Sequence, residues 1–223
     1  MTILLKLTVI GIGPGHPAYI TEAARTKLNA AAIVIGVERQ LETVRPYLRK
    51  YAKEVPYNGR LTSLKDAIDS YLTATDAGLL AEAANTDEDV ISILASGDPS
   101  FYGITEWLRQ TYPIAISVEP GISSTQLLFA KAGIPMHDYF MTSLHGRTDA
   151  LKELLDHPKL CLLTDRTYTP FAIAQYCLNH GENPRIIVGE RLSYTDEKIT
   201  DAPASAIEDR DYQMSVVIVI HER

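Results

Sequence analysis

Five short segments rich in glycine, hydroxyl and charged residues carry the candidate chemistry of this 223-residue chain. Each follows a short apolar run and precedes a stretch with helical character, so each is expected at the carboxyl end of a strand. Ligands of open α/β sheets bind at that edge. The five segments are 11–16, 96–103, 119–124, 143–147 and 162–167.

The first loop, GIGPGH at 11–16, approaches a dinucleotide-binding fingerprint without completing it. That fingerprint is G-x-G-x-x-G, and here the sixth position is His16. Pro14 also removes a backbone N–H that a pyrophosphate would need. A loop that closely approaches a different adenosyl ligand is favoured, while a dinucleotide site and a glycine-rich turn without a ligand stay open.

The second and third loops, SGDPSFYG at 96–103 and EPGISS at 119–124, each offer a structural and a binding interpretation. Gly97 permits a close backbone approach, and Asp98 either caps the following helix or contacts a ligand. Ser123 and Ser124 either cap a helix or present hydroxyl and N–H groups to a ligand. Several such loops at strand ends make a ligand site more plausible than one loop alone.

The fourth and fifth loops, SLHGR at 143–147 and LLTDRT at 162–167, add two arginines. The guanidinium groups of Arg147 and Arg166 suit bidentate binding of a substrate carboxylate. The alternative is that both loops are merely solvated.

Other classes of function find little support. Lys+Arg 21 minus Asp+Glu 28 gives a net charge of −7, and no basic run exists, so a nucleic-acid partner is not expected. A local basic patch for an anionic substrate remains compatible with that charge.

The six histidines form no i,i+4 pair, so no metal site is expected. No apolar run approaches the roughly 18 residues of a membrane helix. Cys161 and Cys177 lie in apolar surroundings and are expected to be buried thiols in a reducing cytoplasm.

Apolar and helical segments alternate along most of the chain, which predicts an α/β fold with largely parallel strands. Helices are expected at 21–31, 37–45, 62–84, 101–110, 123–133, 148–156 and 169–180. The last three strands have no helix between them, so some of these are expected to be antiparallel. The break at 111–113 (TYP) suggests two domains, residues 1–113 and 114–223.

Three motifs in order resemble the tetrapyrrole (corrin/porphyrin) methylase family: GIGPGHPAYIT at 11–21, SGDPSFYG at 96–103 and EPGISS at 119–124. The similarity extends along the chain to QMSVVIVI at 213–220. The resemblance implies a two-domain fold, with a mostly parallel sheet in the N-terminal domain and a mixed sheet in the C-terminal domain. It also implies S-adenosylmethionine in the cleft between the domains, S-adenosylhomocysteine as a product, and a homodimer.

Within the family, 143–147 and LLTDRTYTP at 162–170 look most like the branch that methylates C5 of a precorrin ring in cobalamin biosynthesis. The substrate would then be a precorrin or cobalt-precorrin, with C15 methylation and decarboxylation left to a separate partner. Three alternatives stay open: another methylase of the family, a dinucleotide-dependent oxidoreductase, and a non-catalytic ligand-binding module.

The resemblance assigns the cofactor roles to individual residues, and the chemistry of the expected substrate and reaction suggests the others. Expected cofactor-binding residues are Pro14, Gly97, Asp98, Phe101, Ser123, Ser124, Leu163 and Met214. Expected substrate contacts are Arg147, Arg166 and Tyr102, with Arg39 as a third cation and Tyr168 as a second ring. His145 is the candidate proton acceptor.

Overall fold

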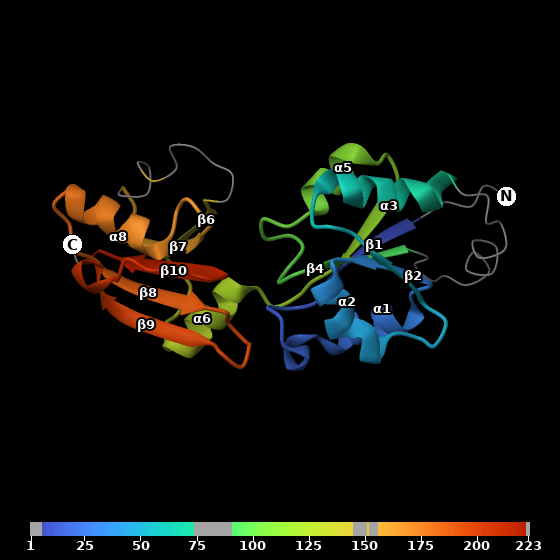
Figure 1. The fold of residues 1–223 in the computed structure, drawn as a ribbon, viewed down its shortest axis with the longest axis horizontal. Coiled ribbons are helices and arrows are strands. Elements are labelled where there is room, and N and C mark those ends of the chain that lie inside the picture. The colour runs from blue at the N-terminus through green and yellow to red at the C-terminus, as the bar shows by residue number, and fades with distance from the viewer. Residues whose placement is uncertain (1–5, 74–90, 145–150, 152–155, 222–223) are drawn as a thin grey trace. The chain divides into compact units, whose positions relative to one another are not determined.

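The chain divides into two compact units, residues 1–123 and 124–223, each with its own five-stranded sheet (Figure 1). The computed structural model describes residues 6–73, 91–144, 151 and 156–221. The boundary falls later than the expected residue 113, because strand β5 (Ala115–Glu119) pairs in parallel with β1 (Lys6–Gly11). β5 therefore completes the first sheet instead of opening the second.

The sheet of the first unit is parallel throughout, in the order β3-β2-β4-β1-β5. Its remaining strands are β2 (Ile33–Gly36), β3 (Lys53–Pro56) and β4 (Ile91–Ala95). Every residue of β2 and β4 is buried. Strands covered on both faces are expected to be continuously apolar, which is the pattern that the sequence shows.

Helices cover both faces of this sheet. They are α1 (Glu22–Ala30), α2 (Glu38–Val44), α3 (Leu61–Thr73) and α5 (Thr105–Thr111), with 3-10 turns at Pro17–Tyr19 and Arg45–Tyr47. α1 and α2 pack on one face, and α3 and α5 pack on the other. The hydroxyl of Thr21 accepts the N–H of Ala24 at 3.1 Å and so caps α1, as predicted. Of the helix expected over 62–84, residues 74–84 lie outside the described residues.

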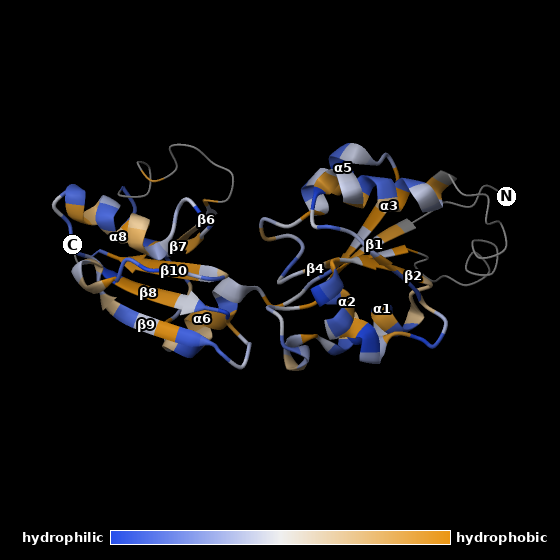
Figure 2. Ribbon diagram, in the orientation of Figure 1, coloured by the Kyte–Doolittle hydropathy of each residue, from blue (hydrophilic) through white to orange (hydrophobic). Residues whose placement is uncertain are grey.

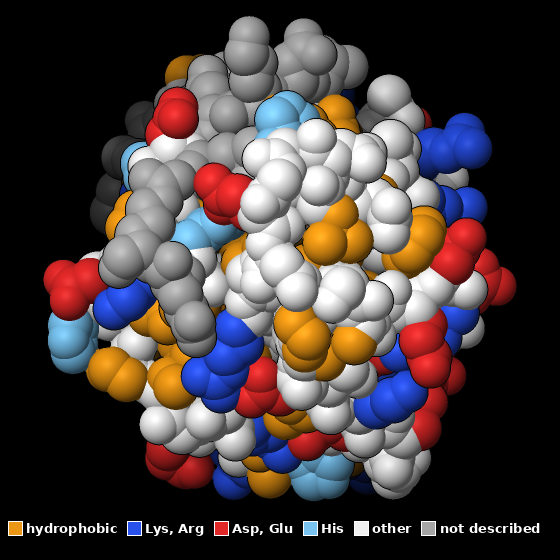
Figure 3. Space-filling model, turned by 90° about the vertical axis from the view of Figure 1, so that its left-hand side faces the viewer, with side chains coloured by type: hydrophobic (Ala, Val, Ile, Leu, Met, Phe, Trp, Pro, Cys, Tyr) orange, Lys and Arg blue, Asp and Glu red, His pale blue; other side chains and the backbone are white. Residues whose placement is uncertain are grey.

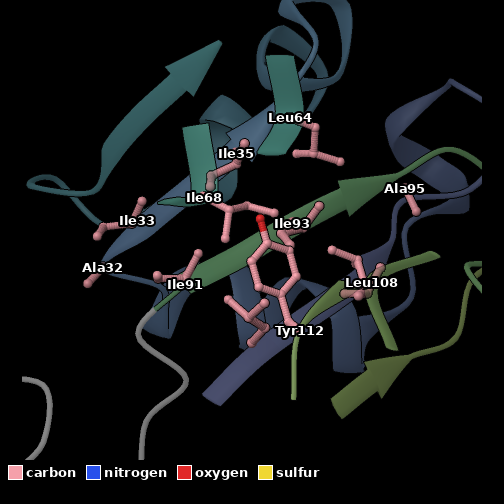
Figure 4. Packing of buried hydrophobic residues seen from close by; sticks show 12 residues of the cluster. Ala32, Ile33, Ile35, Leu64, Ile68, Ile91, Ile93, Ala95, Leu108 and Tyr112 are labelled. Atoms are coloured by element: carbon pink, nitrogen blue, oxygen red, sulfur yellow. The ribbon is translucent and has the colours of Figure 1, made fainter. Parts of the chain in front are cut away.

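Figure 4 shows the larger of the two hydrophobic clusters in this unit. Ile91 and Ile93 of β4 pack with Leu64 and Ile68 of α3 on one face of the sheet. Tyr112 follows α5, and its side chain contributes to the same cluster. Figure 2 shows hydrophobic strands in both sheets and helices with one hydrophilic side.

The sheet of the second unit is mixed, as predicted, in the order β6-β7-β10-β8-β9. Its strands are β6 (Phe140–Ser143), β7 (Lys159–Leu163), β8 (Arg185–Glu190), β9 (Lys198–Pro203) and β10 (Ser215–Ile220). Only β6 and β7 pair in parallel, and the last three strands are antiparallel to their neighbours. Among the described residues, the sheet is flanked by α6 (Ser124–Ala132) and α8 (Pro170–Asn179), and a 3-10 turn spans Ala204–Ala206. The helix expected over 148–156 lies largely outside the described residues.

The face of the second unit shown in Figure 3 carries basic side chains interspersed with acidic ones. Among the described residues on that face, Lys and Arg do not gather into one patch. Within the described part of the chain, no helix combines the length and apolar character needed to cross a membrane.

Candidate functional site

The first two candidate loops leave neighbouring strands of the first sheet. β1 and β4 pair directly, with Gly11 opposite Ala95 at their carboxyl ends. The chain then continues to α1 on one face and to α5 on the other. Where adjacent parallel strands send their connections to opposite faces, a crevice opens that binds ligands. The loops therefore occupy the expected ligand position in this sheet.

A backbone bridge joins these two loops. The N–H of Gly13 donates to the carbonyl of Gly97 at 3.3 Å, and the N–H of Gly97 donates to the carbonyl of Gly13 at 2.7 Å. The N–H of Ile12 also has a partner, the carbonyl of Ala95, at 3.0 Å. Because Pro14 has no N–H, these three consecutive residues offer no amide to a pyrophosphate. This arrangement argues against the dinucleotide alternative, whereas a ligand without phosphate groups does not need these amides.

The third loop packs backbone to backbone against the first two. A Cβ on Gly121 would lie 2.2 Å from the carbonyl oxygen of Gly97 and 2.9 Å from the Cα of Gly11. A Cβ on Gly11 would lie 2.5 Å from the nitrogen of Gly121. These positions require glycine because any side chain would overlap main-chain atoms. Three segments far apart in the sequence thus meet at the carboxyl edge of the sheet.

Asp98 links the second loop to the third. Its Oδ1 accepts the N–H of Ser100 at 2.7 Å, and its Oδ2 accepts the N–H of Gly121 at 3.3 Å. The first bond closes a turn, but it does not cap a helix: α5 begins only at Thr105 and not at the expected residue 101, so the capping interpretation of Asp98 is wrong. The second bond joins two loops and fixes their separation.

Phe101 and Tyr102 follow on the same loop. Their rings meet edge to face, with centroids 5.1 Å apart. Tyr102 is 48% exposed and has a φ of 51°, an uncommon value for an aromatic residue. Strained and exposed residues cluster at ligand sites, so Tyr102 remains a candidate contact. Pro14, by contrast, is buried.

A network that sequence reasoning missed holds the start of the second loop. The buried amide of Gln40 accepts the N–H of Val37 at 3.0 Å and donates to the hydroxyl of Ser96 at 3.1 Å. Arg39 donates to the same hydroxyl at 3.4 Å. The exposed cation of Arg39 therefore lies beside the second loop.

The two serines of the third loop fall in different units. Ser123 is buried at the end of the first unit, and Ser124 begins α6 in the second. The helix start predicted here from the sequence is confirmed.

The second unit contains a cavity of about 670 Å³, lined by residues 164–167 and 212–215. The two segments adjoin because β7 ends at Leu163 and the antiparallel β10 begins at Ser215. The hydroxyl of Thr164 joins them, lying 2.7 Å from both the carbonyl oxygen and the hydroxyl of Ser215. A volume of this size lies within the usual range of small-molecule sites, about 300–1,000 Å³.

Two residues expected from the sequence, Arg166 and Met214, line this cavity. Met214 is 52% exposed and has a φ of 45°. Asp165 shapes the loop, because its Oδ1 accepts the N–H groups of Thr167 and Tyr168 at 2.8 and 2.7 Å. Tyr168 itself packs half-buried against the core of this unit, not in the cavity lining. His145 and Arg147 lie outside the described residues.

Tyr212 also lines the cavity and was not singled out from the sequence. The guanidinium carbon of Arg210 lies 4.0 Å from the centroid of its ring. Arg210 in turn donates to both oxygens of the buried Glu190. For this cluster the sequence offered one signal, the carboxylate of Glu190, which follows the apolar run Ile186, Ile187 and Val188.

The two cysteines are buried and free, as predicted. Burial raises the pKa of Cys161 to about 12 and that of Cys177 to about 11. Neither is therefore a thiolate near neutral pH. Among the described residues, no group of three His, Cys, Asp or Glu side chains is arranged to hold a metal ion.

The fold and these loops define a class of protein. The sequence profile of the tetrapyrrole (corrin/porphyrin) methylases matches residues 6–208, and the chain belongs to this family. It is 34% identical over 221 residues to the cobalt-precorrin-7 C(5)-methyltransferase of Salmonella typhimurium, covering 97% of this chain and 100% of that relative.

The chain shares its fold with many solved structures. The precorrin-6Y methylase of Archaeoglobus fulgidus superposes with a TM-score of 0.69 at 21% identity, covering 97% of this chain and 98% of the other. The uroporphyrin-III C-methyl transferase of Thermus thermophilus, complexed with S-adenosylhomocysteine, gives 0.68 at 20% identity, with 96% and 97% covered. The family and fold that the motifs implied are thus confirmed.

Proposed function

We propose that this chain transfers a methyl group from S-adenosylmethionine to C5 of a precorrin-type macrocycle in cobalamin biosynthesis. The acceptor would be cobalt-precorrin-7 or precorrin-6B. The observation that carries the proposal is the 34% identity with the Salmonella C(5)-methyltransferase, which spans nearly all of both chains. The family match and the loops at the carboxyl edge of the first sheet support it.

When bound, S-adenosylmethionine would supply an electrophilic methyl group for in-line displacement by the nucleophilic ring carbon. The residues of the chain then have to bind and orient the two reactants. Correct orientation alone can contribute about 7–11 kcal/mol to lowering a barrier. No protein nucleophile is required, and His145, the proposed proton acceptor, would take the proton released from the methylated carbon.

The described residues fit an adenosyl ligand better than a dinucleotide. The consecutive amides at Ile12 and Gly13 are already engaged, and Pro14 has none, so a phosphate would lack donors at these three positions. In the second unit, the side chain of Met214 and the hydroxyl of Thr164 offer mixed apolar and polar contacts suited to a nucleoside. The residues proposed to hold the cofactor are Pro14, Gly97, Asp98, Phe101, Ser123, Ser124, Leu163 and Met214.

Substrate recognition would rest on cations and one exposed ring. A precorrin carries many carboxylates, so a chain of net charge −7 needs basic groups locally at its site. We propose Arg166 and Arg147 for these contacts, with Arg39 beside the second loop as a third. Tyr102 would pack against the macrocycle with its exposed ring.

We further propose a cytoplasmic homodimer, as the family resemblance implies. The buried free thiols accord with a reducing compartment. We also propose that C15 methylation and decarboxylation belong to a separate protein, a proposal supported by the name of the Salmonella relative, which mentions C5 alone.

The first test is a thermal-shift titration with S-adenosylhomocysteine, with NAD as the control. At about 100 times Kd, a ligand that binds only the native state adds about 2.7 kcal/mol. For a chain of this size the expected rise in Tm is about 5–11 °C, at roughly 2–4 °C per kcal/mol. Incubation with S-adenosylmethionine and cobalt-precorrin-7 should then add one methyl group, detected by mass spectrometry and located at C5 by NMR.

The outcomes separate the competing functions. A shift with NAD and none with S-adenosylhomocysteine would favour the oxidoreductase. Binding without a methylated product from either precorrin would favour another acceptor or a non-catalytic binding module.

Arg166→Ala is expected to raise KM for the precorrin about tenfold or more, while the Kd for S-adenosylhomocysteine changes less than about twofold. A hydrogen bond to a charged partner contributes about 1.5–3 kcal/mol, and about 1.4 kcal/mol corresponds to tenfold. Steady-state kinetics and calorimetry measure the two constants. Arg109→Ala, which removes an exposed arginine on α5 outside the candidate loops, is the control. A large loss of cofactor affinity instead would place Arg166 against the cofactor.

A further inference from the structure

In the second unit, the buried carboxylate of Glu190 pairs with the partly exposed Arg210, and neither residue has a part in the chemistry proposed above. The carboxylate of Glu190 ends β8, and its side chain is only 9% exposed. Arg210 donates from Nη1 to Oε1 at 2.9 Å and from Nη2 to Oε2 at 2.5 Å. A buried charge is tolerated only when it is paired and hydrogen-bonded, and a bidentate arginine gives the most directional pairing. The pair therefore fixes the guanidinium in one orientation.

Arg210 also contacts Tyr212, a residue of the cavity wall. Its guanidinium carbon lies 4.0 Å from the ring centroid of Tyr212, and its Nη1 also donates to the carbonyl of Asp211 at 3.0 Å. The hydroxyl of Tyr212 donates to the carbonyl of Glu208 at 2.8 Å. The ring is thus held at one face and at its hydroxyl, and it contributes to the lining of the 670 Å³ cavity.

The same carboxylate residue fixes the far end of this segment. In the β8–β10 ladder Glu190 lies opposite Ser215, the first residue of β10. Segment 211–214 therefore runs between two points that Glu190 anchors, one through Arg210 and one through strand pairing. It ends at Met214, whose φ of 45° persists only because the surrounding structure constrains it.

We propose that Glu190 is a positioning residue of the methyltransferase site, acting through Arg210 and Tyr212 to preform the wall at residues 212–215. The inference rests on the proposed function, because it takes the cavity beside Met214 as part of the cofactor site. Without the ion pair, the segment would have to be ordered when the ligand binds, and that ordering would lower the affinity. None of the three residues is a catalytic residue in this scheme.

The test compares two ion pairs on the same strand. Arg185, at the other end of β8, makes a similar bidentate pair with Asp201, at 2.8 Å from Nε and 2.6 Å from Nη2. Lysine keeps the charge but cannot reproduce the planar fork, so Arg210→Lys and Arg185→Lys remove the same geometry from different places. Calorimetry with S-adenosylhomocysteine, urea unfolding and steady-state kinetics are measured for both variants.

Arg210→Lys is expected to weaken binding of S-adenosylhomocysteine about tenfold, because residues 212–215 would have to be ordered when the ligand binds. At saturating S-adenosylmethionine, kcat should remain within about threefold of the wild type. The substitution adds an ordering cost to ligand binding and leaves the chemical step unchanged. Arg185→Lys should change the same Kd less than about twofold, as expected for a largely exposed pair.

Tyr212 provides a second pair of variants that keeps the ion pair intact. Tyr212→Phe retains the ring above Arg210 and should bind S-adenosylhomocysteine within about threefold of the wild type, whereas Tyr212→Leu should lose about tenfold. Equal losses for Arg210→Lys and Arg185→Lys, or unchanged affinity in Tyr212→Leu, would overturn the positioning role. Failure of the wild-type chain to bind S-adenosylhomocysteine would instead overturn the proposed function, and the inference with it.

Discussion

Gly121→Ala is expected to lower the free energy of unfolding by about 3 kcal/mol or more and to weaken binding of S-adenosylhomocysteine about a hundredfold. The new Cβ would lie 2.2 Å from the carbonyl oxygen of Gly97 and 2.8 Å from the carbonyl carbon of Gly11. Both neighbours are main-chain atoms in loops tied to strands, so neither can move aside like a flexible side chain. Relief requires the third loop to separate from the first two. Urea unfolding and calorimetry measure the two effects.

Gly133→Ala is the matched control for this substitution. Gly133 follows α6, and nothing lies within 4 Å of the position that its Cβ would take. Its φ of +67° makes alanine strained there, at a cost of about 1–2 kcal/mol, but no loop is displaced. Cofactor affinity should therefore stay within about twofold of the wild type. If both variants lose similar affinity, close packing of the three loops is not what the ligand requires.

Much of the fold could be predicted because its signals are local. Ile91–Ala95 is a continuous apolar run, as a strand covered on both faces must be, and Thr21 precedes its helix as a cap. The domain boundary was predicted too early because pairing between β1 and β5 joins segments about a hundred residues apart. The residues around 113 do not indicate that pairing. The break there therefore suggested a domain boundary at a point where the first sheet is not yet complete.

The candidate loops could be predicted for a similar reason. Gly97 and Gly121 lie against the main chain of other loops. Because such contacts require glycine, the loops at the strand ends can be recognised in the sequence by their glycine content. The supporting contacts could not be predicted. Gln40 reaches Ser96 only because β2 lies beside β4, and Arg210 reaches Glu190 only because β10 pairs with β8. Such partners depend on strand order, which periodicity alone does not determine.

Asp98→Asn is expected to lower the free energy of unfolding by about 1.5–3 kcal/mol, the contribution of one hydrogen bond to a charged group. The two carboxylate oxygens accept separate amides, Ser100 at 2.7 Å and Gly121 at 3.3 Å. Asparagine has a single acceptor oxygen, so its NH₂ group would face one amide donor to donor. Because the lost bond links two loops of the proposed cofactor site, the Kd for S-adenosylhomocysteine should rise about tenfold as well.

Asp165→Asn separates this effect from a general cost of removing a loop carboxylate. Asp165 receives the amides of Thr167 and Tyr168 on the same oxygen, Oδ1, so an asparagine keeps both bonds. Its unfolding free energy should fall by less than about 1 kcal/mol, a neutral acceptor being weaker than a charged one. Asp98→Ala, which removes both acceptors, should be more damaging than Asp98→Asn in urea unfolding and in calorimetry. Wild-type stability and affinity in Asp98→Asn would show that the link between the second and third loops does not depend on this carboxylate, and Asp98 would then serve only the local turn to Ser100.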